Sequence, residues 1–276
     1  MGDGRVEAPA VSAALEIERR VATRLGRPVT AIGWGAFKIG RNEGVKYPTP
    51  YDLPTDAQSS ELIHAVIDLG IGVIDTAPAY GLSEARLGAA LGARRERIFL
   101  SSKAGETFES GRSTYDFSHP AVERSLRRSL DRLRTAHLDL AWVHSDGGDE
   151  TILREGGAMR ALEEAKEAGS VHAIGFSPKT LAGAMAALDD ARTDALMLEF
   201  HPRDASMLPA IERAGREGRA VFVKKPLASG HLSPSEAIPW ILRHPQVTCV
   251  VVGGLNAERL RVTAALATPS APERSS

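Results

Sequence analysis

Four side chains that can hold or move protons stand at or just beyond the ends of short apolar segments. Asp75 ends one segment, Lys103 ends the next and His144 ends the one after that, while Tyr80 follows Asp75 on the connecting stretch. Taken singly, each has an ordinary structural role as a turn carboxylate, a snorkelling lysine, a hydrogen-bonded imidazole or a packed ring. Strands of one parallel barrel would bring all four to the same end, where chemistry is usual.

The chemistry that this set supports is proton donation to an oxygen that gains negative charge. Tyrosine titrates near pKa ~10, and a neighbouring lysine is expected to lower the pKa of Tyr80. Asp75 would neutralise and orient Lys103, and His144 would hydrogen-bond the substrate oxygen or share its proton. Carbonyl reduction forms such an alkoxide. A metal site is disfavoured because a lysine and a tyrosine stand near the histidine, and a serine triad lacks its G-x-S-x-G turn.

The elements that must position these residues follow an alternating pattern. Eight short apolar segments, residues 29–37, 71–77, 97–103, 137–144, 171–177, 195–201, 219–225 and 247–253, predict buried strands. Helical periodicity between them predicts helices over 59–70, 83–92, 120–133, 158–169 and 207–218. Eight such units predict an α/β fold, the (β/α)8 TIM barrel. An open doubly wound sheet competes, but Lys38 stands where the third glycine of its G-x-G-x-x-G turn belongs.

A second candidate site follows the last apolar segment. Gly253 and Gly254 end that segment, and a helix is predicted to begin near Asn256, with Arg259 one turn inside. The free N–H groups and the dipole of a helix N-terminus attract phosphate, and barrels commonly bind phosphate at their last two loops. A glycine turn with an asparagine cap explains the same residues, so both interpretations stay open. Lys224, at the end of the preceding segment, favours phosphate.

Length and composition restrict the class of protein. The chain has 276 residues, 43% of them hydrophobic, and its 34 Lys and Arg against 35 Asp and Glu give a net charge of −1. That balance gives no basis for binding nucleic acid or a membrane surface. No leader or membrane-spanning run is recognisable, so we expect a cytoplasmic protein. We expect one domain over residues 1–276, with residues 1–10 and 268–276 disordered, and structural packing for the single cysteine, Cys249.

The segment DTAPAYGLSEARLG, residues 75–88, resembles the D-T-A-x-x-Y-G-x-S-E-x-x-L-G segment of the aldo-keto reductase family. The segments GWGAFKIG, IGFSPKT, KKPLASG and VVGGLNAERL are similar to further family segments, and the resemblance covers about residues 25–265. It implies a barrel oxidoreductase that uses NADP(H), with NAD left open, on a small carbonyl or alcohol substrate. The implied catalytic residues are Asp75, Tyr80, Lys103 and His144, and the implied substrate contacts are Trp34, Tyr80 and His144. The implied cofactor contacts are Gly35, Ala36, Phe37, Asp75, Ser177, Lys224, Pro226, Leu227, Gly230, Gly253, Gly254, Asn256 and Arg259.

The chain departs from the family pattern where the nicotinamide is held. Pro178 stands where the family often has Asn, Met197 where a Gln is usual, and Lys224 where an aromatic ring often stacks on the nicotinamide. Gly253 stands where many members have a lysine that contacts the 2′-phosphate of NADP. The preference for NADP over NAD is therefore left open. These departures motivate a second hypothesis, a nicotinamide-binding sensor or regulatory protein with negligible turnover. A third hypothesis, a barrel lyase or isomerase, predicts no nicotinamide binding.

Further expectations concern the rim of the site. Residues 108–118 are the main candidates for substrate contacts, and Trp142 is a further pocket candidate. Glu84 is expected only to shape the turn and to begin a helix. The sequence leaves the substrate, the direction of the reaction and the oligomeric state open.

Overall fold

The computed structural model describes residues 14–45 and 47–268, and at their centre eight parallel strands close into a barrel. The strands follow the order β10, β11, β12, β3, β4, β5, β8 and β9 around the barrel. Their bounds are β3 (Ile32–Gly35), β4 (Val73–Asp75), β5 (Phe99–Ala104), β8 (Leu140–His144), β9 (Ile174–Ser177), β10 (Ala195–Glu199), β11 (Ala220–Lys224) and β12 (Cys249–Gly253). Each of the eight predicted apolar segments supplies one strand, so the (β/α)8 prediction is confirmed.

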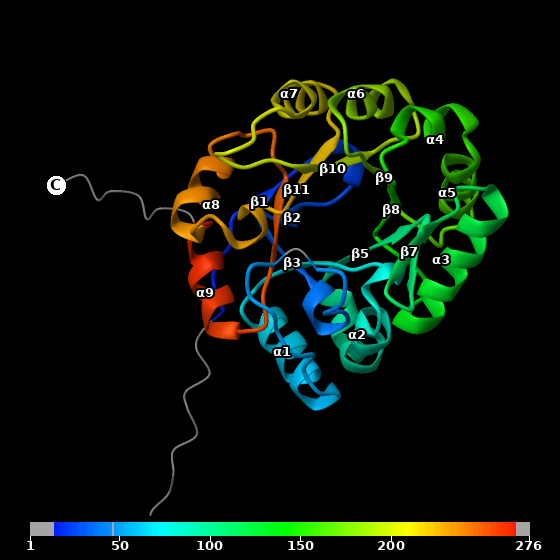
Figure 1. The fold of residues 1–276 in the computed structure, drawn as a ribbon. Helices are drawn as coiled ribbons and strands as arrows, with labels where there is room; N and C mark the ends of the chain where they lie inside the picture. Colours follow the sequence, from blue (N-terminus) through cyan, green and yellow to red (C-terminus); the bar gives the residue numbers. More distant parts are fainter. Residues whose placement is uncertain (1–13, 46, 269–276) are drawn as a thin grey trace, which may run out of the picture.

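Helices surround the strands, as Figure 1 shows. They are α1 (Asp56–Asp68), α2 (Ser83–Leu91), α3 (His119–Leu133), α4 (Asp149–Glu155), α5 (Gly157–Glu167), α6 (Leu181–Asp189), α7 (Leu208–Arg216), α8 (Pro234–Leu242) and α9 (Ala257–Ala265). Local sequence explains several of their starts. Thr55 and Gln58 form a capping box on α1, and the Asn256 side chain accepts a hydrogen bond from the backbone N–H of Arg259 on α9. Among the described residues, no helix combines the length and apolar character that a bilayer span requires.

The barrel interior is filled by large side chains from β5, β8 and β11. Trp142 and Phe222 meet edge to face with ring centres 5.2 Å apart, and Phe99 stacks on Phe222 at 6.1 Å. Gly175 makes room for this layer, because a Cβ there would lie 2.1 Å from Trp142 Cε3. A second apolar cluster, between the strands and the helices, holds the outward-facing side chains. The interior is therefore a packed core rather than a channel.

The period of two along each strand determines which polar residues face the barrel axis. Phe99, Trp142 and Phe222 are interior residues, so Lys103, His144 and Lys224 share their faces, further along the same strands. Val73 and Asp75 are related in the same way on β4. An apolar layer thus lies beneath a polar layer at the carboxyl ends of the strands.

Two short β-hairpins lie outside the barrel. Strands β1 (Arg19–Arg20) and β2 (Val29–Thr30) pair antiparallel, and the residues between and beside them, including Leu25, join the interior apolar cluster. Strands β6 (Glu106–Glu109) and β7 (Arg112–Tyr115) form the second hairpin, directly after β5. The chain leaves β5 for this hairpin at Gly105, whose φ is +104°, and a Cβ there would lie 2.4 Å from Phe117 Cε1.

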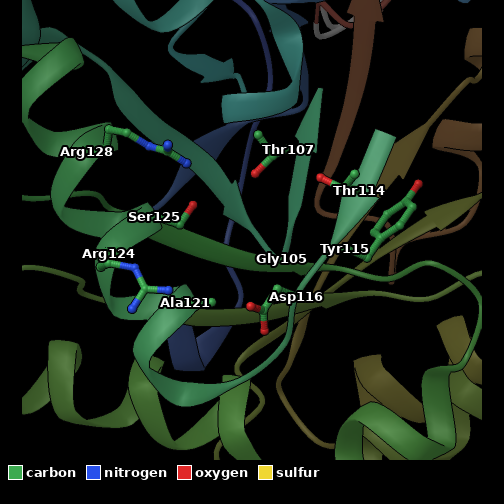
Figure 2. A pocket seen from close by; sticks show the side chains of 9 residues that line it. All are labelled: Gly105, Thr107, Thr114, Tyr115, Asp116, Ala121, Arg124, Ser125 and Arg128. Carbon is green, nitrogen blue, oxygen red and sulfur yellow. The ribbon is translucent and has the colours of Figure 1, made fainter. Parts of the chain in front are cut away.

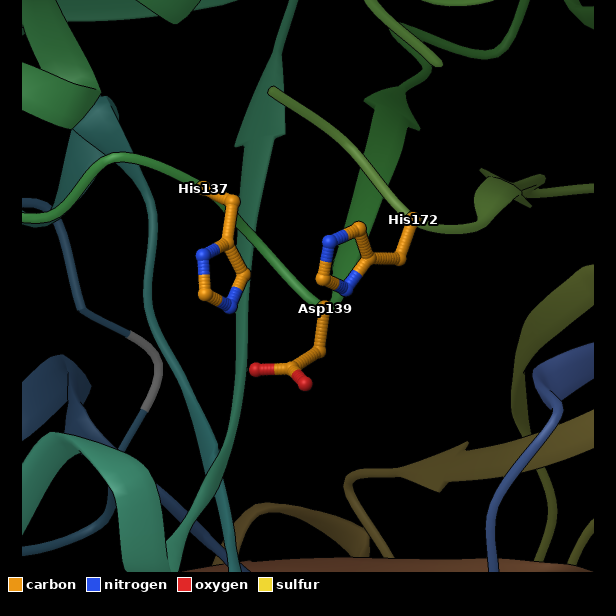
Figure 3. Close-up of side chains that lie close together, drawn as sticks. All are labelled: His137, Asp139 and His172. Atoms are coloured by element: carbon orange, nitrogen blue, oxygen red, sulfur yellow. The ribbon is translucent and has the colours of Figure 1, made fainter. Parts of the chain in front are cut away.

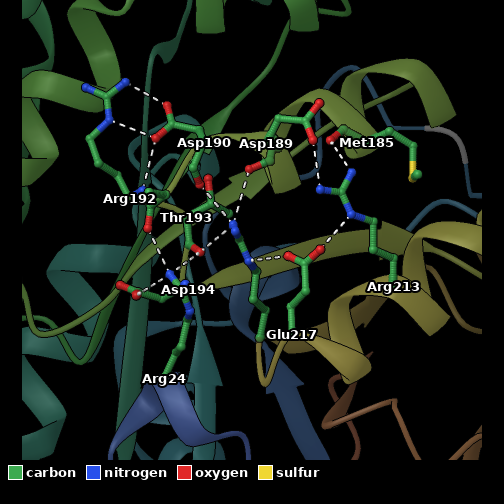
Figure 4. A network of polar contacts seen from close by, with 12 residues as sticks. Arg24, Met185, Asp189, Asp190, Arg192, Thr193, Asp194, Arg213 and Glu217 are labelled. Atoms are coloured by element: carbon green, nitrogen blue, oxygen red, sulfur yellow. Dashed lines mark hydrogen bonds and ion pairs between the residues drawn. The ribbon is translucent and has the colours of Figure 1, made fainter.

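Buried ion pairs and side-chain-to-backbone bonds occupy the amino ends of the strands. Arg219, immediately before β11, donates to the carbonyl oxygens of Asp190 and Thr193 at 2.9 and 2.8 Å. Asp194, before β10, accepts from the backbone N–H of Ile174 and from Lys166 Nζ. Figure 4 shows this network with its flanking pairs, among them Arg213 with Asp189. Its bonds tie the α6–β10 connection to neighbouring elements, which is a stabilising role.

Two sequence expectations are not settled by the fold. The predicted disordered ends, residues 1–10 and 268–276, lie outside the described residues except for Thr268. That residue hydrogen-bonds the carbonyl of Ala265 at the end of α9. The single-domain organisation of residues 1–276 stays a prediction.

Candidate active site

Asp75 and Lys103 form a buried ion pair at the carboxyl ends of β4 and β5. Lys103 Nζ donates to Asp75 Oδ2 at 2.5 Å and to the carbonyl oxygen of Thr76 at 2.8 Å. Ser101 Oγ donates to the second carboxylate oxygen at 2.7 Å. Burial alone would lower the pKa of Lys103, but the charges of Asp75 and Tyr80 outweigh burial and raise it. Lys103 is therefore held as a cation in a dry site.

Tyr80 lies against this pair, in the short helical turn η3 (Pro78–Tyr80). Lys103 Nζ lies 4.7 Å from the centre of the tyrosine ring. The expected lowering of the tyrosine pKa is not what the structure gives: burial raises the pKa of Tyr80, and the charge of Lys103 opposes burial without overcoming it. Tyr80 thus keeps its proton at neutral pH, while the lysine favours the phenolate that proton donation would leave.

His144 faces Tyr80 across the site, and a carboxylate lies behind it. The two rings are perpendicular, with centres 6.5 Å apart. Glu106 Oε2, from the start of β6, lies 2.8 Å from His144 Nδ1. Burial lowers the pKa of His144, Glu106 opposes this effect, and the charges of Lys103 and Lys224 add to it. Burial alone would raise the pKa of Glu106, but His144, Ser113 and Arg41 lower it to about 2.

Sequence reasoning missed Glu106. The residue belongs to a hairpin without apolar alternation, so no strand pattern marks it. Its one signal is its position, three residues after Lys103 and just past the end of a barrel strand. Its carboxylate is fixed from the opposite strand of the hairpin, because Ser113 Oγ donates to Glu106 Oε1 at 2.6 Å.

Lys224 brings a further amine to the same end of the barrel. Its Nζ donates to Ser177 Oγ at 2.8 Å and to the carbonyl oxygen of Pro178 at 3.2 Å. Burial, together with the charges of Lys225 and Lys103, lowers the pKa of Lys224 to about 7. The lysine therefore changes charge near neutral pH.

The other predicted cofactor residues lie at the carboxyl ends of neighbouring strands. Gly35 ends β3, and Ala36 and Phe37 follow it. Strand β3 pairs with β12, which ends at the predicted phosphate residue Gly253 and is followed by Gly254, Asn256 and Arg259. Pro226, Leu227 and Gly230 lie on the connection after β11. Asn256 is the cap of α9, which bears out the plain structural role for that one side chain. Arg259 is exposed, and its guanidinium has no carboxylate within 4 Å among the described residues, whereas its neighbour Arg261 pairs with Glu258 at 3.0 Å.

The two tryptophans do not line the mouth of the site. Trp34 is fully buried in the cluster between strands and helices, and its indole N–H donates to the carbonyl oxygen of Gly254 at 3.1 Å. Its face of β3 points away from the barrel axis, so the substrate contact expected of it is not supported. Trp142 is also fully buried, in the apolar layer beneath His144.

Aromatic and cationic groups form the rim. The Phe37 ring meets Tyr80 edge to face with centres 4.9 Å apart. The Arg41 guanidinium lies 3.2 Å from the centre of the Phe108 ring, which joins the loop after β3 to the β6–β7 hairpin. Residues 108–118, the expected substrate contacts, thus begin at this rim.

Glu84 does more than begin a helix. It is fully buried, and its carboxylate accepts a hydrogen bond from Ser102 Oγ at 2.6 Å. Arg132 of α3 lies 3.5 Å from the other carboxylate oxygen. Because Ser102 points outward between Ser101 and Lys103, Glu84 fixes the strand that carries the catalytic lysine candidate.

A histidine cluster lies at the opposite end of the barrel. His137 and His172 stack with ring centres 4.4 Å apart beside Asp139, as Figure 3 shows. The three side chains offer ligand atoms within 4.8 Å of one another. However, Asp139 accepts from Arg27, from Arg95 and from the backbone N–H of Leu100, at 2.9 to 3.1 Å. Two guanidinium charges oppose a cation there, so we assign no metal to the cluster.

The fold and the cluster at its carboxyl ends define a (β/α)8 barrel with an Asp–Tyr–Lys–His site. The model of the aldo/keto reductase family matches residues 31–237. A solved structure from Pseudomonas aeruginosa, whose description assigns it to the aldo-keto reductases, is 36% identical with a TM-score of 0.84, over 94% of this chain and 98% of that chain. The D-threo-aldose 1-dehydrogenase of a Pseudomonas species is 28% identical over 244 residues, 78% of this chain and 71% of that protein. A Klebsiella pneumoniae aldo/keto reductase, solved with NADP and acetate, is 21% identical with a TM-score of 0.70, over 93% of each chain. The chain belongs to the aldo/keto reductase family.

Proposed function

We propose that this protein reduces an aldehyde or ketone, or oxidises the corresponding alcohol, with a nicotinamide cofactor and with Tyr80 as the general acid and base. The observation that carries the proposal is the contact of Lys103 with both Asp75 and Tyr80 opposite His144. A buried tyrosine beside a buried ammonium can donate its proton and be stabilised as the phenolate. Membership of an oxidoreductase family agrees with this assignment.

The residues present fit a nicotinamide dinucleotide. Ser177 and Lys224 offer a hydroxyl and an amine beside His144. At the start of α9, Arg259 offers a guanidinium that pairs with no carboxylate of the described residues. The N-terminus of this nine-residue helix adds a positive dipole end for phosphate. We infer NADP(H) as the first candidate, since Arg259 suits an additional phosphate. The Klebsiella barrel of the same fold was solved with that cofactor.

When bound, the cofactor supplies or accepts the hydride, and this chain manages the proton. In reduction, Tyr80 Oη donates its proton to the carbonyl oxygen as negative charge develops there. Lys103 stabilises the resulting phenolate, and Asp75 keeps the lysine charged and in place. In oxidation the same phenolate takes the proton from the alcohol.

Because of Glu106, the role of His144 differs between the reduction and the oxidation direction of the reaction. The ionised carboxylate beside Nδ1 favours a proton on that nitrogen, which leaves Nε2 as an acceptor in the neutral ring. Neutral His144 then accepts a hydrogen bond from an alcohol, whereas it donates to a carbonyl only as the imidazolium. We therefore expect the optimum pH for reduction to lie below that for oxidation.

The sensor hypothesis rests on one specific contact. Lys224 Nζ donates a hydrogen bond to Ser177 Oγ. The family resemblance implies that this hydroxyl contacts the cofactor, so the lysine competes with the cofactor for it. If that bond persists with cofactor present, the nicotinamide is held without being aligned for hydride transfer, and binding occurs without turnover.

Cofactor titration followed by turnover assays separates these functions. Fluorescence titration with NADPH and NADH gives both affinities, and absorbance of the reduced cofactor then follows a panel of aldehydes, aldoses and ketones. The enzyme hypothesis expects binding and turnover, with Arg259→Gln weakening NADPH by about tenfold and the control Arg261→Gln leaving it unchanged. Binding without turnover on any substrate supports the sensor, and absence of binding contradicts both.

A further inference from the structure

The β6–β7 hairpin has two faces, and only one belongs to the site described above. Glu106 faces His144, and side chains alternate along a strand, so Thr107 points to the opposite face. Thr114 is its cross-strand partner and shares that face. There, between the hairpin and α3, lies a pocket of about 400 Å³ that Asp75, Tyr80, Lys103 and His144 do not line.

The pocket gathers positive charge from α3. Arg124 and Arg128 lie one turn apart, and Figure 2 shows both guanidinium groups extending from the helix toward the hairpin. In the described part of the chain, no carboxylate oxygen lies within 4 Å of either group. Other arginines of the same helix are paired: Arg127 with Glu123 at 2.5 Å, and Arg132 with Glu84 at 3.5 Å.

One carboxylate also lines the pocket. Asp116 lies at its edge, and its Oδ1 accepts a hydrogen bond from the backbone N–H of Ser118. Two guanidinium charges therefore face one carboxylate that already has a partner, and the net charge of the lining is positive.

A buried hydroxyl without a partner points to a ligand. Ser125 lies between the two arginines and is 6% exposed, and its Oγ has no hydrogen-bond partner among residues 14–45 and 47–268. Buried hydroxyls are normally paired, because leaving one unpaired costs free energy. The hydroxyl-bearing Thr107 and Thr114 line the opposite wall.

We propose that this pocket binds a phosphate group, either as the free ion or as part of a small phosphorylated molecule. Two guanidinium forks and several hydroxyl donors supply more hydrogen bonds than a carboxylate accepts, and they match the oxygens of a phosphate. The site is separate from the proposed cofactor loop after β12, and it stands whether or not the protein proves to be a reductase.

Isothermal titration of the full chain with inorganic phosphate and with glycerol 3-phosphate tests the proposal. Low-salt buffer is needed because exposed guanidinium charges are screened by ions. We expect saturable binding that Arg128→Gln weakens by about tenfold and Ser125→Ala by a few-fold. The control Arg127→Gln, on the same helix but paired with Glu123, leaves the affinity unchanged. Tighter binding of glycerol 3-phosphate assigns the pocket to a phosphorylated molecule, and equal binding assigns it to the free ion.

The same variants show whether phosphate binds in this pocket or at the proposed cofactor-phosphate site near Arg259. Ser125→Ala removes a hydroxyl that makes no hydrogen bond within the described part of the chain, so the thermal unfolding midpoint is expected to stay unchanged while phosphate binding falls. The proposal is overturned if phosphate does not bind, if Arg128→Gln and Ser125→Ala bind it like wild type, or if only Arg259→Gln loses binding.

Discussion

Glu106 and Lys224 add to the Asp–Tyr–Lys–His site two groups whose charge responds to their neighbours. Glu106 stays ionised because His144, Ser113 and Arg41 overcome its burial, and Lys224 stays poised near neutrality because nothing overcomes its burial. Both side chains lie within the electrostatic range of His144. The protonation of His144, and with it the expected pH optimum of the proposed reaction, therefore depends also on two residues outside the four implied by the sequence.

Replacing Glu106 with Gln tests its charge through stability. The pKa of Glu106 is lowered from 4.5 to about 2, so the carboxylate stabilises the fold above pH ~4.5, and that stability is lost as the pH falls through 2. Glu106→Gln is expected to be less stable than wild type at pH 7, and the difference should shrink by about 2 kcal/mol by pH 3. Urea unfolding at both pH values measures it. A pH-independent difference, or the same behaviour in the exposed control Glu109→Gln, would argue against the assigned role.

The pKa of Lys224 predicts a dependence of the same sign in a higher pH range. It is lowered from 10.5 to about 7, so the buried ammonium destabilises the fold at low pH, and the penalty fades as the pH rises from 7 toward 10.5. The stability advantage of Lys224→Met over wild type should shrink by roughly 3 kcal/mol between pH 6 and pH 9. Denaturant titrations across this range check the trend, and Lys225→Met, which removes a charge that lowers the pKa of Lys224, should weaken it. Parallel curves for wild type and Lys224→Met would contradict the lowered pKa.

At the scale of elements, the barrel followed from the sequence because its strands are apolar runs of uniform length between amphipathic helices. The proposed site followed in part, since Asp75, Lys103 and His144 end strands whose order the fold determines. The β6–β7 hairpin could not be predicted, because three of the four residues of β6 and all of β7 are at least partly exposed. Its position depends on Gly105, on the bond between Ser113 and Glu106 and on the contact of Arg41 with Phe108. The direction of the Tyr80 pKa shift could not be predicted from the sequence either, because burial raises this pKa and the Lys103 charge lowers it.

The hairpin should be sensitive at the glycine where it leaves β5. Gly105→Ala forces a side chain into a φ of +104° and brings its Cβ within 2.4 Å of Phe117, which should displace Glu106 from His144. We expect a loss of about 1–3 kcal/mol in stability and a clear fall in turnover. Gly111 has φ +77° but no neighbour within 4 Å, so Gly111→Ala isolates the backbone cost alone. Equal turnover in the two variants would show that the position of the hairpin does not matter to the site.

At the scale of the whole molecule, the two ends of the barrel carry different tasks. The carboxyl ends hold the proposed proton-transfer residues, and the amino ends hold buried ion pairs such as Asp139 with Arg95 at 2.9 Å. This division is usual in such barrels, where one face serves chemistry and the other stability.

Asp139→Asn should therefore separate stability from activity. It leaves the buried Arg95 without its carboxylate partner, and we expect a loss of about 3 kcal/mol in the free energy of unfolding. The kcat/KM of the folded variant should match wild type. Chemical denaturation and steady-state rates measure the two effects, and Asp68→Asn, at an exposed pair with Arg97, is the control with little effect on either. A matching fall in kcat/KM would show that the two ends are coupled.

The most direct test of the account is the effect of Tyr80→Phe on turnover with cofactor binding measured in parallel. If Tyr80 donates the proton, kcat for the best carbonyl substrate should fall by about 10²–10⁴-fold, because general acid catalysis contributes that much. The affinity for reduced cofactor should stay within a few-fold of wild type, because the ring of Tyr80 remains in place. Undiminished turnover in Tyr80→Phe would contradict the proposed function at its centre.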